Sequence, residues 1–134
     1  MPPSATEQGR NLAVAAECLY LANITLAPVI GFLLLLWLRY RQTPQTPRLA
    51  RCHLRQAIFG SLWAGVLMIV LNAVILLLGG YRSTNVLITL ILYFFSIHSA
   101  LILLGMAGLA NALAGKLFVY PLIGRRCDDE SLFQ

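Results

Sequence analysis

Glu17, Asn72 and His98 are polar side chains within long apolar runs of this 134-residue sequence, and each can exchange a proton or make hydrogen bonds. A polar group inside a hydrocarbon layer is costly, so it faces the interior of a helix bundle or a water-filled path. A proton path needs titrating groups at stepped depths, and here only Glu17 and His98 titrate, on different helices. We therefore interpret all three as residues that hydrogen-bond between helices, with Glu17 and Asn72 in the outer half of the membrane.

The two histidines, His53 and His98, are the residues that would bind a haem or another pigment. Axial histidines of a b-type haem lie at similar depth, but the expected helices separate His53 from His98 by roughly 20 Å along the membrane normal. One chain therefore cannot supply both ligands. His98 is a haem or pigment ligand only if another subunit supplies the second one. A hydrogen-bonded interior histidine is the simpler interpretation, so we expect no cofactor.

Arginines crowd the segment "RLARCHLRQ", residues 48–56, just before an apolar run. Arg48, Arg51 and Arg55 follow at i, i+3 and i+7, which places them on one stripe of a helix. An arginine near an anionic membrane surface contributes about 1 kcal/mol of attraction. We therefore expect the stripe to face lipid headgroups, with arginines that mainly fix the orientation of the span that follows. The alternative is a specific site for an anionic lipid or an acidic partner.

Small residues form one side of the last apolar run, in "GMAGLANALAG", residues 105–115. Gly105, Gly108, Ala112 and Gly115 recur there at helical spacing. Such a face lets another backbone approach closely, so it predicts helix packing, either within the chain or against a partner.

The remaining reactive side chains do not form a catalytic or metal-binding pattern. Cys18, Cys52 and Cys127 are far apart and lack CxxC spacing, which indicates free thiols rather than a disulfide framework or a zinc site. The acidic residues 128–130 are consecutive, so their side chains point apart, as in a solvated tail. With no nucleophile beside a base and no phosphate-binding glycine loop, the sequence predicts that the protein is not an enzyme.

The composition requires a membrane around these residues. Hydrophobic residues make up 59% of the chain and charged residues 11%, with a mean hydropathy of +0.77, more than a soluble domain of this size can bury. The net charge of +5 comes from basic residues that flank the apolar runs, a pattern that argues against nucleic acid as a partner.

Three apolar runs are each long enough to cross a membrane: residues 11–38, 54–79 and 86–114. Only helices satisfy their own backbone in lipid, so we predict an all-α, polytopic membrane protein with three transmembrane helices in one domain, residues 1–134. Pro28 removes a helical hydrogen bond, which predicts a kink in the first span. Thr46 and Pro47 are typical of a helix start, so the second helix should begin with an interfacial extension before its span.

The distribution of Lys and Arg predicts the orientation of these spans. Eight of the ten lie between residues 39 and 55 or in the tail at residues 115–134, and the other two are Arg10 and Arg82. Short loops rich in arginine stay in the cytoplasm. We therefore expect a multi-pass protein of the cytoplasmic (inner) membrane, with its N-terminus outside and with the basic loop at residues 39–53 and the C-terminal tail inside.

A family resemblance rests on residues at the ends of the three spans: Pro28 and Trp37, then His53, Gln56 and Ala57, then Gly115, Tyr120 and Pro121. In this pattern the chain resembles a group of small bacterial membrane proteins that is often grouped with the membrane component of the chloroplast inner-envelope import translocon. The resemblance covers about residues 17–124. It implies a compact helical fold and carries no catalytic residues.

Two functional classes fit these observations. The first is a non-enzymatic accessory or assembly subunit of a larger inner-membrane complex, held there by helix packing. The alternative is an oligomeric transport or translocation component, since three spans alone line a pore poorly. The expected partners are anionic membrane lipids together with either other membrane subunits or further copies of the chain.

Overall fold

A computed structural model describes residues 4–79, 83–124, 126 and 127 of the chain. These residues form helices and connecting segments, with no strand among them: α1 (Ala5–Thr25), α2 (Ile30–Tyr40), α3 (Arg48–Gly65), the π-helical turn η1 (Val66–Val70), α4 (Leu71–Gly79) and α5 (Thr84–Leu113). The all-α prediction is confirmed. Tyr81, Arg82, Arg125 and the acidic residues 128–130, which enter the predicted loops and orientation, lie outside the described residues.

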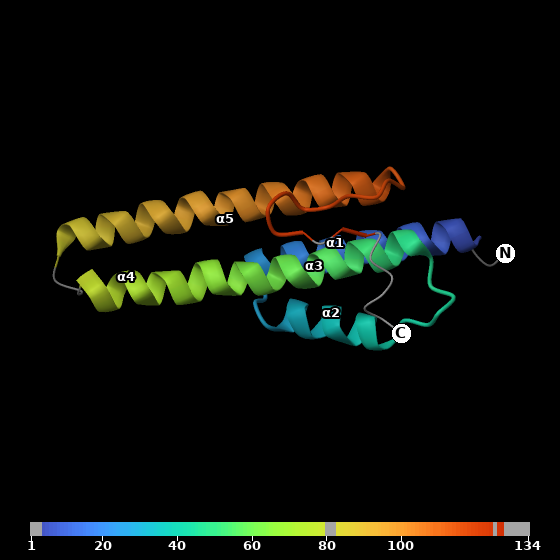
Figure 1. The fold of residues 1–134 in the computed structure, drawn as a ribbon, viewed down its shortest axis with the longest axis horizontal. Coiled ribbons are helices and arrows are strands. Elements are labelled where there is room, and N and C mark those ends of the chain that lie inside the picture. Colours follow the sequence, from blue (N-terminus) through green and yellow to red (C-terminus); the bar gives the residue numbers. More distant parts are fainter. Residues whose placement is uncertain (1–3, 80–82, 125, 128–134) are drawn as a thin grey trace.

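Among the described residues, two helices are long and apolar enough to cross a membrane: Arg48–Gly79, with 32 residues, and Thr84–Leu113, with 30. The first is α3, η1 and α4 without a break, and it lies beside α5 (Figure 1). The two helices overlap the predicted spans at residues 54–79 and 86–114. The first of them begins at Arg48, before its apolar run. Pro47 is the N-cap of this helix, and no side chain caps its first turn. Thr46 Oγ1 accepts a hydrogen bond from the Thr43 amide (3.0 Å).

The run at residues 11–38 does not form the single kinked span that the sequence predicts. α1 ends at Thr25, α2 begins at Ile30, and α2 folds back along α1 and α3 (Figure 1). The three-span architecture is therefore not confirmed. The start of α1 lies at the same end of the molecule as the α2–α3 loop and the segment after α5.

The reversal between α1 and α2 follows from three residues. Pro28 has no N–H to continue the helix. The side-chain oxygen of Asn23 accepts hydrogen bonds from the amides of Val29 (3.2 Å) and Phe32 (3.1 Å), which supplies partners for the first turn of α2. Gly31 lets the two helices meet, since a Cβ there would lie 2.7 Å from Asn23 Cβ. Pro28 would only kink an isolated helix, but in this structure it lies in the turn between α1 and α2.

The buried core lies at one end of the molecule. It is formed by apolar and aromatic side chains from α1, α2, α3 and the segment after α5: Ala16, Tyr20, Leu35, Leu54, Ala57, Ile58 and Tyr120. We call this half the packed end. The other half consists of residues 66–79 and 84–100, and none of its described residues is buried. We call it the stem, and across it Tyr93 donates a hydrogen bond to the Leu67 carbonyl of the π-helical turn (2.9 Å).

Residues 116–124, which we call the strap, fold back over the packed end after α5 (Figure 1). α5 ends in a Schellman motif: the Gly115 amide bonds to the Ala112 carbonyl (3.0 Å) and the Lys116 amide to the Asn111 carbonyl (2.9 Å). Gly115 adopts φ +67°, a conformation that glycine reaches without strain. This turn directs the strap back toward α1 and α3.

Candidate functional site

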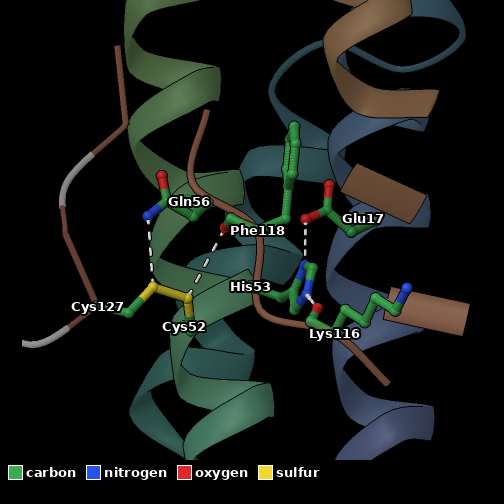
Figure 2. Close-up of a disulfide and its surroundings, with 7 residues drawn as sticks. All are labelled: Glu17, Cys52, His53, Gln56, Lys116, Phe118 and Cys127. Atoms are coloured by element: carbon green, nitrogen blue, oxygen red, sulfur yellow. Dashed lines mark hydrogen bonds and ion pairs between the residues drawn. A yellow bond between two sulfur atoms is a disulfide. The ribbon is translucent and has the colours of Figure 1, made fainter. Parts of the chain in front are cut away.

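Glu17, His53 and Tyr120 form a buried polar cluster, although they come from α1, α3 and the strap. Glu17 Oε1 lies 2.7 Å from His53 Nδ1, and the Tyr120 hydroxyl donates to Glu17 Oε2 at 2.5 Å. His53 Nε2 lies 2.9 Å from the carbonyl oxygen of Lys116 (Figure 2). Glu17 and His53 are 0% exposed and Tyr120 is 1% exposed. The cluster therefore ties three distant parts of the chain together.

The hydrogen bonds of His53 define where its protons lie. A carbonyl oxygen only accepts, so Nε2 carries a hydrogen and donates it to Lys116. One further proton is shared by Nδ1 and the Glu17 carboxyl group: either an imidazolium donates to a carboxylate, or a carboxylic acid donates to a neutral imidazole. The His53–Glu17 pair has no net charge in either form, which limits the cost of burying it.

Tyr120 is a hydrogen-bond donor in this cluster. Burial raises the pKa of Tyr120, and the negative charge of Glu17 together with the hydrogen bond to it raises that pKa further. The hydroxyl therefore keeps its proton. The ring packs edge-on against Tyr20, with centroids 5.5 Å apart, and the Tyr20 hydroxyl donates to the Leu101 carbonyl of α5 (3.1 Å).

Two glycines let helix backbones approach the cluster. A Cβ on Gly108 of α5 would overlap the Glu17 carboxylate. A Cβ on Gly60 of α3 would lie 2.7 Å from Cε2 of Tyr120 and 2.9 Å from Cε2 of Tyr20. Larger residues at either position would push the carboxylate or the rings out of place.

The small-residue face of α5 is turned toward α1 along most of its length. Gly105 lies against Tyr20 and Leu21, Gly108 lies against Glu17, and Ala112 is fully buried. Gly115 does not belong to this face, contrary to the sequence prediction. No atom comes within 4 Å of a Cβ placed there, because Gly115 lies beyond the last turn of the helix.

The predicted positions of Asn72 and His98 require correction. Asn72 donates to the Met68 carbonyl of its own helix (2.5 Å) and lies nineteen residues after His53, about 28 Å along the helix. It therefore cannot reach Glu17, whose partner is His53. His98 is half-buried in the stem with its ring stacked on Phe94 (centroids 5.4 Å apart), about 15 Å along α5 from Gly108. The packed end does not enclose it.

The three arginines of α3 do not share one surface. Arg48 and Arg51 are exposed, whereas Arg55 is only 7% exposed. The reason is that α2, α1 and the strap cover α3 on all sides over residues 52–58. A headgroup-facing role therefore fits Arg48 and Arg51 and not Arg55.

The residues that carried the family resemblance lie in different environments. Pro28 and Pro121 occupy exposed turns, and Trp37 is exposed with the Arg41 guanidinium 4.7 Å above its ring. His53 and Gln56, by contrast, are both 0% exposed, so they do not form a solvated polar face at the end of a helix.

The expectation of three free thiols is wrong. Cys52 of α3 and Cys127, beyond the strap, form a disulfide with their Cα atoms 5.5 Å apart (Figure 2). They are 75 residues apart in sequence, and the return of the strap over α3 brings them together. Cys18 is free and exposed.

The cluster has the arrangement of a structural hydrogen-bond network that links α1, α3 and the strap. Each side-chain nitrogen and oxygen of Glu17, His53 and Tyr120 has a hydrogen-bond partner. Among the described residues, no three His, Cys, Asp or Glu side chains are grouped so that they could hold a metal ion.

Sequence reasoning missed this cluster because it assigned the wrong depth to Glu17. A single span over residues 11–38 puts Glu17 far from His53, whereas the reversal after Thr25 puts both at the same end. A turn signal was present: Asn23, Pro28 and Gly31 together are typical of a helix end followed by a new helix start.

Comparison with known proteins identifies one family. No curated protein and no solved structure gives a significant match to the chain, and nothing supports the similarity to the chloroplast import translocon. A family model described as the magnetosome magnetite crystal formation protein family matches residues 8–126, which agrees with the expected group of small bacterial membrane proteins. Because the match covers nearly the whole described chain, this membrane protein belongs to the magnetosome magnetite crystal formation protein family.

Proposed function

We propose that the chain is a non-enzymatic accessory protein of magnetite crystal formation, and that it acts by packing its stem against other membrane subunits. The family match over residues 8–126 supports the link to crystal formation. The two long apolar helices support a permanent place in the membrane. The buried cluster then serves to hold the packed end together.

The observation that carries this proposal is the unpacked stem. Helices of 32 and 30 residues are about 48 and 45 Å long, more than the roughly 30 Å of a hydrocarbon core. In the stem, large apolar side chains such as Leu92 (63% exposed) and Phe95 (64% exposed) point away from the molecule. Lipid tails cover such side chains as readily as protein does, and another transmembrane helix can pack against them by van der Waals contact. The stem therefore offers a surface for other subunits, separate from the packed end.

The reversal between α1 and α2 supports an orientation with both ends in the cytoplasm. Two crossing helices return the chain to its starting side, and the α1–α2 hairpin enters the membrane without crossing it. Arg10 then joins the other basic residues, so that nine of the ten Lys and Arg residues lie on one side and Arg82 alone lies on the other. This replaces an external N-terminus in the inner membrane by an internal one.

The test is crystal formation in the host. Removing the gene should change the size distribution of magnetite crystals seen by electron microscopy, and the wild-type gene should restore it. A Leu92→Ala, Phe95→Ala double variant should insert normally but restore the distribution poorly. Leu33→Ala, at an exposed apolar position of α2 (57% exposed), is the matched control and should restore it fully.

Unchanged crystals after gene removal would exclude a role in crystal formation. Full restoration by the stem variant would exclude stem packing as the mechanism. Glu17→Gln separates an accessory role from an enzymatic one, since glutamine can still hydrogen-bond to His53 and Tyr120 but cannot exchange a proton. We expect this variant to restore the crystals, whereas an enzyme that uses the pair would lose its activity.

A further inference from the structure

The Cys52–Cys127 disulfide lies at the end of the molecule where reducing conditions are expected. Cys52 directly follows Arg51 on α3, and Cys127 directly follows Arg126, both arginines being exposed. Arginine-rich segments of a membrane protein stay in the cytoplasm. Cytosolic proteins keep their thiols reduced, and the disulfides found there are mostly transient and redox-sensing. On the cytoplasmic side, a disulfide at this place is expected to open and close.

We propose that Cys52–Cys127 is a thiol–disulfide exchange site for a dithiol reductant, and that its reduction releases the end of the strap from α3. The inference rests on the disulfide, on its surroundings and on the proposed cytoplasmic side of the packed end, and it does not depend on the proposed role in crystal formation.

The burial of the two sulfurs determines the course of the exchange. Cys52 is 4% exposed, whereas Cys127 is half-buried, so an incoming thiolate reaches Cys127 Sγ. That attack forms a mixed disulfide with Cys127 and breaks the bond to Cys52, which leaves as a thiolate and takes up a proton. The second thiol of the reductant then displaces Cys127 as a thiol. Two electrons pass to the protein and the reductant becomes a disulfide.

The contacts around the disulfide indicate which part of the strap would be released. The first half of the strap is held without the disulfide. His53 Nε2 donates a hydrogen bond to the Lys116 carbonyl, and the Tyr120 hydroxyl donates one to Glu17. Beyond it, Gly124 packs against the Gln56 carboxamide, and Gln56 Nε2 lies 3.7 Å from Cys127 Sγ (Figure 2). Reduction removes the covalent attachment of this last part only. It should therefore uncover Gln56 without unfolding the packed end.

The experiment uses full-length Cys18→Ser protein in mild detergent, in which Cys52 and Cys127 are the remaining cysteines. Dithiothreitol is the reductant, and a maleimide reagent that adds mass counts the free thiols. We expect no labelled thiol before reduction and two after it, without denaturant. Amide exchange at Ile123 and Gly124 should rise about tenfold or more on reduction, as in local opening, while exchange in α3 and α5 stays unchanged.

A Cys127→Ser variant serves as a reductant-free comparison, and its Ile123 and Gly124 amides should exchange at the rate of the reduced protein. Trapping thiols in intact cells with a membrane-permeant alkylating agent should reveal both the oxidised and the reduced form. The proposal is overturned if the cysteines react only after denaturation, if reduction leaves the exchange at Ile123 and Gly124 unchanged, or if the trapped cellular protein is always in a single form.

Discussion

At the scale of single residues, Glu17 is the acceptor on which the packed end depends. Both of its carboxyl oxygens are used, one by His53 and one by Tyr120. An apolar residue in its place would leave a buried imidazole N–H or nitrogen and a buried hydroxyl without partners. Glutamine keeps one acceptor and one donor, so it should be tolerated better.

Replacing Glu17 therefore gives a graded prediction for stability. Glu17→Leu should destabilise the folded protein by about 3–5 kcal/mol, as is usual when one partner of a buried pair is removed, and Glu17→Gln by clearly less. Thermal unfolding in detergent measures both. Cys18→Ser, at the next position and exposed, is the control and should change stability by no more than about 0.5 kcal/mol. Equal unfolding temperatures for Glu17→Leu and the control would show that the cluster contributes nothing to stability.

Tyr120 makes stability depend on alkaline pH. Because the folded state raises the pKa of Tyr120, its contribution is fully present below the ordinary tyrosine pKa of about 10 and is lost as the pH rises above it. Unfolding temperatures measured from pH 8 to pH 11 should fall above about pH 10. Tyr120→Phe should begin less stable and fall less steeply. A parallel decline in the two proteins would argue against this role for Tyr120.

At the scale of elements, close contact between α1 and α5 depends on a missing side chain at Gly108. The space there is filled by the Glu17 carboxylate, whereas at Gly65, the last residue of α3, no atom lies within 4 Å of the place that a Cβ would occupy. The two glycines are therefore a matched pair, one packed and one open.

Gly108→Ala should destabilise the protein, because the added methyl group would overlap the carboxylate that accepts two hydrogen bonds. Gly65→Ala should be neutral or stabilising by up to about 1 kcal/mol, the usual helix preference for alanine. Denaturation midpoints of the two variants decide the matter. Similar losses for both would mean that α5 can shift away from α1 at little cost.

Element type was predictable from the sequence, and element direction was not. The two long runs that end near Gly79 and Leu113 have no competing turn signal, so length and hydropathy were enough to identify them. The α1–α2 run contains both an apolar span and a turn, and a span-length count cannot separate a kink from a reversal. The contacts that depend on that direction, above all the one between Glu17 and His53, therefore could not be predicted from the sequence. The Cys52–Cys127 pairing could not be predicted for another reason, because it depends on the path of the strap.

At the scale of the whole molecule, the packed end and the stem divide the chain into a fixed half and an exposed half. The start of α1, the start of α3 and the strap lie together at the packed end, and the end of α4 and the start of α5 lie at the far end of the stem. The proposed topology follows from this arrangement, with Ser4 and Ser83 on opposite sides of the membrane.

Cysteine labelling tests that topology. In protein whose native cysteines are replaced by serine, Ser83→Cys should react with a membrane-impermeant maleimide in intact cells. Ser4→Cys should react only after permeabilisation. The original expectation of an external N-terminus makes the opposite prediction for Ser4, so labelling at both positions in intact cells would restore three crossings.

The bond between Tyr120 and Glu17 spans 103 residues, and this separation has a consequence for biosynthesis. At about 5–20 residues per second, roughly 5–20 s pass between the translation of Glu17 and that of Tyr120. During that interval the Glu17 carboxyl group of α1 lacks its Tyr120 donor. The nascent α1–α2 hairpin therefore has to stay near the lipid surface, where water can solvate the Glu17 carboxyl group. It stays there until α3, α5 and finally the strap have been synthesised and enclose that group.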